Sequence, residues 1–189
     1  MSTFPHSTGV IHGRFQVLHN DHLKYLMAGK ALCGHLVVGI TSPDPSLSRT
    51  ENEDLQRSQA KENPLTYYER FRLVNAVLRS KGLSHDDFSV VPFPINFPEL
   101  YRFYVPMDAV FLLSIYDEWG RKKLGYFQKQ GLKTHVLWEV PLEEKGISAH
   151  EVRERMKNNL PWSHLVPRES ATLLNEWQIP ERIRTISSM

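Results

Sequence analysis

The sequence predicts an α/β fold: a parallel sheet of about five strands, helices on both faces, and a helical segment at the C-terminal end. Short apolar runs rich in β-branched residues alternate with longer stretches whose apolar residues recur at helical period. The chain has 189 residues, a length that buries about 70% of its unfolded surface around a single core. We therefore predict one domain over 1–189, with a helical tail over 165–189.

Five short apolar runs are predicted to be the strands. Each is bounded by polar or turn-forming residues, and each is separated from the next by enough chain for a crossover connection. The runs span 9–11, 36–41, 88–92, 109–115 and 135–140.

Capping signals predict the helices between the strands. Asn20 is predicted to cap the first helix, which Gly34 would end. Thr66 with Glu69 three residues later is a capping-box pattern for the second helix, which 81–82 would close.

Two further helical stretches are predicted near the C-terminal end. Ser148 with Glu151 repeats the capping-box pattern and starts a helix that stops by Pro161. The stretch 170–186 is expected to be helical with a break at Pro180. The polar segment 42–63 is predicted to be a long loop, which is typical of a lid, a binding segment or a disordered region.

The composition excludes several classes of protein. Lys and Arg number 23 against 21 Asp and Glu, so the net charge of +2 is too small for a nucleic-acid or membrane surface built on bulk charge. The single Cys33 forms no internal disulfide, and the longest apolar runs, such as 109–113, are too short to span a bilayer. Because 1–8 also lacks a signal-peptide pattern, we expect a cytoplasmic protein that binds neither nucleic acid nor membrane.

Polar residues are densest just after the first predicted strand. His19 and His22 flank the first turn of the predicted helix, and Arg14 lies at the strand exit. Helix N-termini at the carboxyl ends of parallel strands favour phosphate, so this cluster fits stabilisation of negative charge in phosphoryl or nucleotidyl transfer. The alternatives are two exposed histidines beside a cap, or a zinc pair, which Cys33 as the only thiol makes a weak reading.

A second polar cluster surrounds the predicted helix start at Ser148. The start offers backbone N–H groups and a hydroxyl, and Arg153 follows about one turn later, so the cluster could hold a polyphosphate. The alternative is that Ser148 only caps the helix and Arg153 lies beside Lys157 on its surface.

Five motifs occur in a fixed order along nearly the whole chain. They are Gly13-Arg14-Phe15-Gln16, His19-x-x-His22, Asn63-Pro64-Leu65-Thr66-x-x-Glu69-Arg70, Ile147-Ser148-x-x-Glu151-Val152-Arg153, and Pro161-Trp162 with Leu165-Val166-Pro167. Together they resemble the archaeal-type nicotinamide-nucleotide adenylyltransferases. These enzymes belong to the nucleotidylyltransferase superfamily with His-x-Gly-His and Ile-Ser-x-x-x-x-Arg signatures.

The resemblance implies a Rossmann-like enzyme that transfers AMP from ATP to a phosphorylated acceptor, first of all nicotinamide mononucleotide, and releases pyrophosphate. It implies that His19 and His22 contact the ATP phosphates and that Arg14 and Arg153 hold the β- and γ-phosphates. Mg²⁺ would bridge the phosphates with no protein metal ligand assigned, and a homo-oligomer is one arrangement to test.

The resemblance also implies further contacts. Those to the nucleotide would come from Gly13, Phe15, Gln16, Ile147, Ser148, His150 and Lys61, with Arg57 as a competitor to Lys61. Planar stacking on the acceptor would come from Tyr101, Tyr116 and Trp119. For Lys61 and His150 the alternative is a solvated surface side chain, and for the three aromatic residues it is a place in the core.

Two departures from the family pattern bear on activity. Asp21 replaces the Gly between the histidines, and 149–150 read Ala-His where the family has Gly-Thr. A carboxylate gains ~0.3–1 kcal/mol from the helix dipole. About 6 Å from a phosphate it costs roughly 3 kcal/mol at an effective dielectric of ~20. We therefore expect Asp21 to slow catalysis unless it points away or binds the metal.

Those departures leave two rival functions open. One is adenylyl or cytidylyl transfer to another acceptor, such as a pantetheine, flavin or sugar phosphate. The other is a nucleotide-binding module that has lost turnover.

Overall fold

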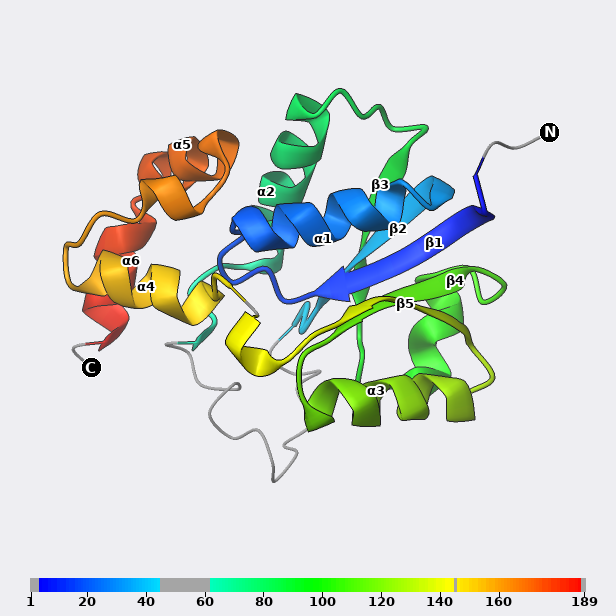
Figure 1. Cartoon of the computed structure of the whole chain (residues 1–189). Helices are drawn as coiled ribbons and strands as arrows, with labels where there is room; N and C mark the ends of the chain where they lie inside the picture. Colours follow the sequence, from blue (N-terminus) through cyan, green and yellow to red (C-terminus); the bar gives the residue numbers. More distant parts are fainter. Residues whose placement is uncertain (1–3, 45–61, 145, 188–189) are drawn as a thin grey trace.

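The computed structural model describes residues 4–44, 62–144 and 146–187. Five parallel strands form one sheet in the order β3-β2-β1-β4-β5 (Figure 1). Each predicted strand is present, and the α/β prediction is confirmed. The strands are β1 (His6–Gly13), β2 (Cys33–Thr41), β3 (Phe88–Phe93), β4 (Val110–Ile115) and β5 (Lys133–Glu139).

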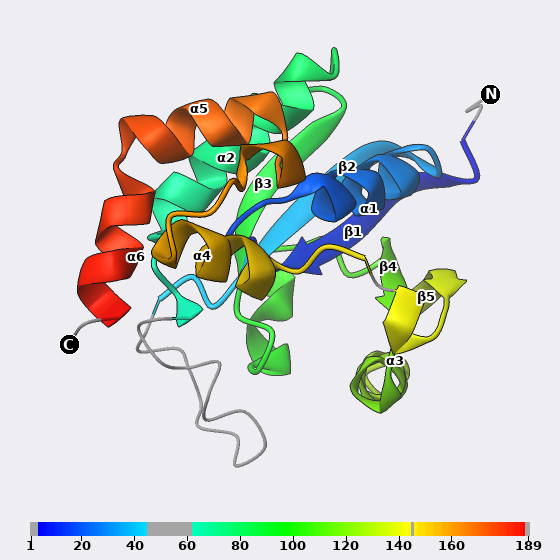
Figure 2. The ribbon, with the colours of Figure 1, turned by 60° about the vertical axis from the view of Figure 1, so that its left-hand side comes forward.

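Helices cover both faces of the sheet, as Figure 2 shows. One face carries α1 (Asn20–Lys30) and α2 (Tyr67–Ser80), and the other carries η3 (Pro98–Phe103) and α3 (Glu118–Lys129). Three C-terminal helices gather beside α2, and two short 3₁₀ turns complete the described elements. These are α4 (Ala149–Lys157), α5 (Arg168–Glu176), α6 (Ile179–Ser187), η4 (Leu142–Glu144) and η5 (Ser163–Leu165).

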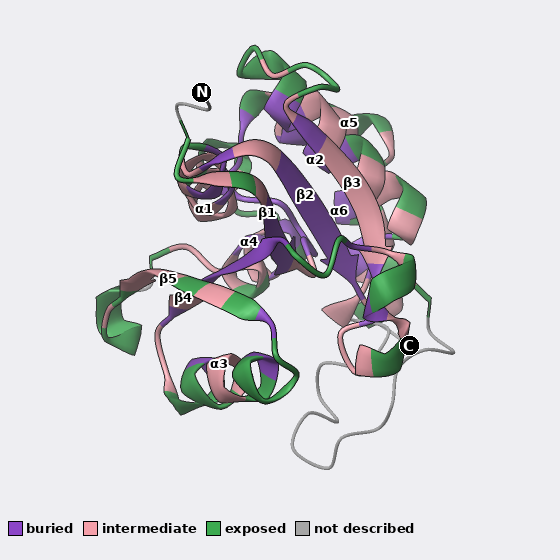
Figure 3. Ribbon diagram, turned by 90° about the vertical axis from the view of Figure 1, so that its right-hand side faces the viewer, coloured by how far each residue is buried: buried purple, intermediate pink, exposed green. Residues whose placement is uncertain are grey.

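Side chains alternate along each strand, so the two faces of the sheet bury separate clusters. Ile11 of β1 packs with the residues of α1 and α2, whereas its neighbour Val10 packs with Phe111 and Phe127 under α3. The C-terminal helices bury a third cluster that includes Val152. Figure 3 shows the buried strands between these layers. The third cluster packs α4 against α2, the other C-terminal helices and the loop that carries Val17.

The sheet divides between its first and fourth strands. The ladder of β1 with β2 extends from His6–Cys33 to Gly13–Ile40, whereas that of β1 with β4 covers only Gly9–Val110 and Val10–Phe111. Figure 3 shows β4 and β5 turning away from the other strands. The strand order also reverses at this point, and in open α/β sheets ligands bind where it reverses. The carboxyl end of β1 is therefore the place to look for a site.

The first helix begins at Asn20, one residue earlier than predicted. His19, not Asn20, is the N-cap of α1, because its Nδ1 accepts the backbone N–H of His22 at 3.3 Å. Gly34 also does not end this helix: α1 ends at Lys30, and Gly34 lies within β2. Both predictions were wrong because an imidazole is an unusual cap and the connection to β2 is shorter than Gly34 indicated.

The other two predicted caps are confirmed. Thr66 and Glu69 form the reciprocal capping box of α2, which ends where the sequence indicated. Ser148 caps α4 by accepting the N–H of Glu151 at 3.1 Å.

Helix α3 is absent from the sequence predictions. Asp117 caps α3 by accepting the N–H of Gly120 at 2.8 Å. For this segment the sequence predicted only contacts to the acceptor. Pro180 also differs from expectation, because it lies in the first turn of α6 rather than at the break. A proline fits there because the first turn needs no N–H donor from it.

None of the described helices combines the length and the apolar character that a bilayer crossing requires.

Candidate active site

The two histidines lie together at the start of α1. Their rings stack with centroids 3.7 Å apart and planes 23° from parallel. The N–H of His22 reaches Nδ1 of His19, and the N–H of His19 reaches Nδ1 of His22 at 3.4 Å. His19 is buried, and Phe15 contacts the edge of the His22 ring at 5.1 Å between centroids. The reciprocal bonds hold both rings in one orientation.

These bonds also determine which ring nitrogen can donate. Because Nδ1 of each histidine accepts a backbone N–H, the neutral rings of His19 and His22 carry their proton on Nε2. Two parallel imidazoles in this tautomer present two N–H donors from one helix start, where the backbone dipole already favours an anion. The arrangement suits the oxygens of a phosphate group.

Arg14 lies just beyond β1, beside Arg70, a second arginine for which the sequence predicted no role. The guanidinium of Arg70 donates to the carbonyl oxygens of Arg14 at 3.0 Å, Thr41 at 2.7 Å and Ser42 at 2.8 Å. Burial, and then the charge of Arg14, lowers the pKa of Arg70 to about 10. Arg70 therefore ties the ends of β1 and β2 to α2 and adds positive potential beside Arg14. The signal in the sequence that could have identified Arg70 was its position in the third motif.

The remaining residues of the first motif pack against protein. The side-chain amide of Gln16 both donates to the carbonyl of Leu65 and accepts its N–H, at 2.8 and 2.9 Å. Phe15 is fully buried, and a Cβ at Gly13 would come within 2.9 Å of its ring. Gln16 and Phe15 thus fix the loop that carries the histidines and join it to the third motif.

Arg153 lies in the same region but is held by protein groups. It is buried, and its guanidinium donates to the carbonyl of Gln16 and pairs with the carboxylate of Glu62. Burial lowers the pKa of the Arg153 guanidinium, and the Glu62 and Glu154 charges oppose this effect. Glu62, for which the sequence predicted no role, directly precedes the third motif. The structure therefore brings Arg153 to the histidine loop, with a carboxylate on the guanidinium.

The start of α4 supplies the other predicted nucleotide contacts. Ser148 Oγ is engaged in the cap, and Ile147 precedes it, partly buried against the C-terminal helices. His150 is largely exposed, with Nδ1 3.8 Å from a carboxylate oxygen of Glu62. Lys61 and its competitor Arg57 lie outside the described residues.

Asp21 points toward α4. Its Oδ2 accepts the backbone N–H of Ile147 at 2.6 Å, and its Oδ1 pairs with Lys24 at 2.7 Å. This contact joins the second and fourth motifs, which lie far apart in the sequence. The carboxylate is therefore occupied by an amide and an ammonium group, a geometry that the sequence could not reveal.

The predicted acceptor residues differ in accessibility. Tyr101 is fully buried and its hydroxyl donates to the carbonyl of Ile95, so it presents no ring face to solvent. Trp138 Nε1 donates to the Tyr116 hydroxyl at 2.8 Å. Trp119 is 41% exposed, and the Lys123 ammonium lies 4.6 Å from its ring centroid. Only Trp119 of the three combines exposure with a neighbouring cation.

His12 is a polar residue inside an apolar strand, and the sequence predicted no role for it either. It lies at the carboxyl end of β1, buried between the rings of Phe93 and Phe127, with centroids 5.7 and 5.4 Å away. Its Nε2 has no hydrogen-bond partner among the described residues. Burial, with a smaller contribution from Lys123, places the pKa of His12 well below its ordinary value. The imidazole is therefore neutral at the point where β1 and β4 separate.

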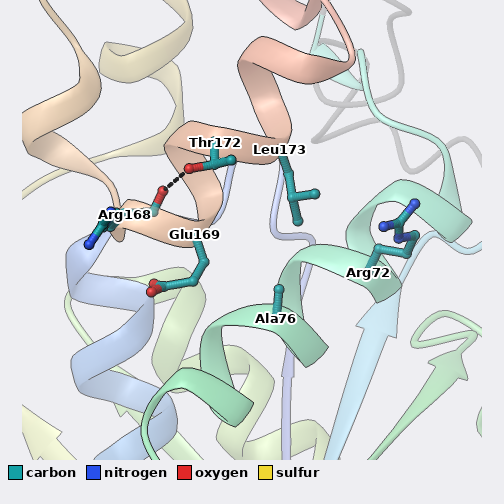
Figure 4. A pocket seen from close by; sticks show the side chains of 6 residues that line it. All are labelled: Arg72, Ala76, Arg168, Glu169, Thr172 and Leu173. Atoms are coloured by element: carbon teal, nitrogen blue, oxygen red, sulfur yellow. Dashed lines mark hydrogen bonds between the residues drawn. The ribbon is translucent and has the colours of Figure 1, made fainter.

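A pocket lies away from the residues described above. Figure 4 shows a pocket of about 320 Å³ between α2 and α5, which includes none of the residues discussed above. It is lined by Arg72, Ala76, Arg168, Glu169, Thr172 and Leu173. Within the described residues, no group of three or more His, Cys, Asp or Glu side chains could hold a metal ion.

Residues 10–155 match the family model described as cytidylyltransferase-like. The chain belongs to the cytidylyltransferase-like family. This nucleotidyltransferase is 46% identical over 177 residues to phosphonoformate cytidylyltransferase of Streptomyces viridochromogenes, covering 94% of this chain and 95% of the relative. It is 29% identical over 182 residues to nicotinamide-nucleotide adenylyltransferase of Thermococcus kodakarensis, covering 95% and 88% of the two chains.

The cytidylyltransferase-like chain also shares its fold with a solved structure. That structure is a bifunctional NMN adenylyltransferase/ADP ribose pyrophosphatase from Francisella tularensis, with a TM-score of 0.63 and 12% identity. The match covers 95% of this chain and 53% of the other, so the chain spans about half of that structure. The comparisons confirm the resemblance to nucleotidylyltransferases and the enzyme class. The family implies a nucleoside triphosphate and a phosphate-bearing acceptor as substrates.

Proposed function

We propose that the protein transfers a cytidylyl group from CTP to a small anionic acceptor of the phosphonoformate kind and releases pyrophosphate. The observation that carries this proposal is the 46% identity to phosphonoformate cytidylyltransferase, against 29% to an archaeal nicotinamide-nucleotide adenylyltransferase. The acceptor edge supports it, because the buried Tyr101 leaves fewer ring faces for a planar base than the sequence predicted. A phosphonate oxygen is the same kind of nucleophile as a phosphate oxygen.

The chain's own residues account for the chemistry without a covalent enzyme intermediate. The acceptor oxygen attacks the α-phosphorus, the new O–P bond forms, and the bond from the α-phosphorus to the bridging oxygen breaks as pyrophosphate leaves. His19 and His22 donate from Nε2 to oxygens whose charge increases, and Arg14 adds a nearby positive charge. Positioning and electrostatic stabilisation supply most of the catalysis in such transfers.

Arg153 has a conditional role in this scheme. Its guanidinium contacts Glu62 and Gln16, so it reaches the triphosphate only where a phosphate oxygen replaces or shares the Glu62 carboxylate. Where Glu62 stays paired with Arg153, its carboxylate offsets most of the guanidinium charge.

Mg²⁺ belongs to the proposal as a companion of the triphosphate. No cluster of three candidate ligands is present among the described residues, so these residues do not form a metal cage. Mg²⁺ typically binds substrate phosphates with few protein ligands and keeps several waters. A cytoplasmic location, where nucleoside triphosphates are available, belongs to the same proposal.

The second candidate is transfer of AMP from ATP to nicotinamide mononucleotide, as a step in NAD biosynthesis. The order of the five motifs favours it, as does 30% identity over 188 residues to the adenylyltransferase of Thermococcus onnurineus. The two candidates share the triphosphate site and differ in base and acceptor.

A crossed assay separates these candidates. Pyrophosphate release is measured with CTP or ATP, each with phosphonoformate, nicotinamide mononucleotide, pantetheine phosphate, a flavin phosphate or a sugar phosphate, in Mg²⁺. We expect the highest kcat/KM for CTP with phosphonoformate and loss of the signal in His22→Ala. Turnover only with ATP and nicotinamide mononucleotide would establish the second candidate. Triphosphate binding without pyrophosphate release from any pair would identify a binding module.

A further inference from the structure

One side chain links the two polar clusters of the site. Asp21 lies in the first turn of α1, directly beside His22, and its Oδ2 accepts the N–H of Ile147 just before the Ser148 cap. A hydrogen bond from an amide to a carboxylate is about twice as strong as a neutral one. The start of α4 is thereby held to the start of α1.

The residue before Ile147 is shaped for this contact. Gly146 has φ +74°, which glycine adopts without cost, and a Cβ on Gly146 would overlap Oδ2 of Asp21. Glycine at position 146 therefore leaves room for the Asp21 carboxylate. Residues 21 and 146 fit each other as a pair.

The charge of Asp21 is offset where it lies. Oδ1 pairs with the exposed ammonium of Lys24, and Oδ2 is bonded to the amide, while the Asp21 side chain is only 17% exposed. A carboxylate that is occupied in this way repels a nearby phosphate less than an isolated one. The repulsion expected from the sequence is therefore replaced by a specific contact.

We propose that Asp21 is a positioning residue, which holds the Ile147–Ser148 segment in register with the histidine pair so that both helix starts face one nucleoside triphosphate. The inference rests on the proposed nucleotidyl transfer but not on the identity of the acceptor. It reverses the expectation that the carboxylate slows catalysis.

The test compares three variants with the wild type. Asp21→Gly removes the carboxylate, Asp21→Asn keeps an oxygen acceptor without the charge, and Lys24→Ala removes the ion pair alone. Equilibrium binding of non-hydrolysable CTP and ATP gives Kd, pyrophosphate release gives kcat and KM, and the NMR shift of the Ile147 amide proton reports the contact. Thermal unfolding shows that each variant is folded.

We expect Asp21→Gly to raise the triphosphate Kd about tenfold, the scale of a lost charge-assisted hydrogen bond. The Ile147 amide resonance should move upfield in Asp21→Gly. Asp21→Asn should recover most of the affinity, and Lys24→Ala should stay within about twofold, as is typical of an exposed ion pair. The acceptor KM should change less than the triphosphate Kd.

Gly146→Ala, alone and with Asp21→Gly, provides an independent check. The alanine clashes with the carboxylate only when Asp21 is present, so the two changes should be less than additive in the triphosphate Kd.

Three results would overturn the inference: Asp21→Gly binding the triphosphate as tightly as the wild type, Asp21→Asn as impaired as Asp21→Gly, or additivity with Gly146→Ala. A wild type that binds neither triphosphate would overturn both this inference and the proposed function. Binding with no acceptor turned over would overturn the proposed function alone.

Discussion

The proposed triphosphate side, made of the histidine loop and the start of α4, and the proposed acceptor edge, made of β4, α3 and β5, are built differently. On the triphosphate side, side chains join motifs that lie far apart in the sequence: Gln16 with Leu65, Arg153 with Glu62, and Asp21 with Ile147. At the β4–α3–β5 edge, Arg121 of α3 bonds to Glu139 of the neighbouring β5 at 2.7 Å, and the hydroxyl of Tyr25 in α1 donates to the carbonyl of Leu112 in β4 at 2.9 Å. We therefore expect substitutions on the triphosphate side to disturb more than one motif, and substitutions in α3 to act mainly on the acceptor.

The largest expected effect on activity comes from replacing His22, one of the two stacked histidines. Replacing His22 with alanine removes one of the two Nε2 donors, and we expect kcat to fall about a hundredfold or more. Asn20→Ala is the matched control, because Asn20 donates to the His164 carbonyl at the same helix start and is predicted to contact neither substrate. Pyrophosphate release measures both. Equal losses in the two variants would show that helix integrity, rather than the imidazole, is responsible.

Arg153→Met tests whether the triphosphate side is also a stabilising unit. It leaves the Glu62 carboxylate and the Gln16 carbonyl without their partner, and breaking a buried pair costs about 3 kcal/mol. A domain of this size then loses about 10 °C in Tm. Arg155→Met, which removes a more exposed pair with Glu151 in the same helix, should cost under about 1 kcal/mol. Thermal and urea unfolding would contradict the pairing if both variants were equally stable.

The stability of the folded protein should depend on pH through His12, which is buried at the junction of the two regions. Because the pKa of His12 in the folded protein lies well below 6.5, the ordinary value for histidine, the unfolded chain binds a proton first as the pH falls. Stability should therefore decrease below about pH 6.5, by up to about 1.4 kcal/mol per pH unit, until the folded imidazole also titrates. Urea unfolding of the wild type and His12→Leu between pH 7 and pH 5 measures the difference. Parallel curves would mean that His12 titrates normally.

Trp119→Ala should give the smallest effect and should act on the acceptor alone. Trp119 is exposed beside Lys123 at the acceptor edge, so its loss should raise the acceptor KM by about fivefold, the scale of one aromatic contact. The triphosphate Kd should stay within about twofold of the wild type. Steady-state kinetics with each substrate varied in turn checks this. An equal rise in both constants would show that the two regions are coupled.

The fold was predictable where periodicity and capping carried the information. The five strands and the caps Thr66 and Ser148 follow from local patterns, and the structure confirms them. The cap at His19 was not predictable, because an imidazole acts as a cap here only with the reciprocal bond from its neighbour. Helix α3 was not predictable from propensity, because Gly120 and Gly125 lie inside it and weaken the helical pattern.

The sequence predicted that the two histidines lie together at a helix start, but not the partners of the residues around them. The spacing identified His19 and His22, and the structure stacks them at one helix start. The sequence could not show that Glu62 pairs with Arg153, nor that Asp21 turns to Ile147, because these contacts depend on how distant segments meet. The roles of these residues in binding and catalysis remain predictions for the experiments above.

The short ladder between β1 and β4 has an engineering consequence. In the described sheet, the ladder between these strands holds only the pairs Gly9–Val110 and Val10–Phe111, while Val10 and His12 also pack on Phe127 of α3. A segment that starts in β4 and ends with β5 can therefore be grafted across this seam with few backbone bonds broken, provided that the packing around Phe127 is kept. Such chimaeras should exchange acceptor preference while retaining the base preference of the recipient, which makes the seam a natural crossover point for recombination.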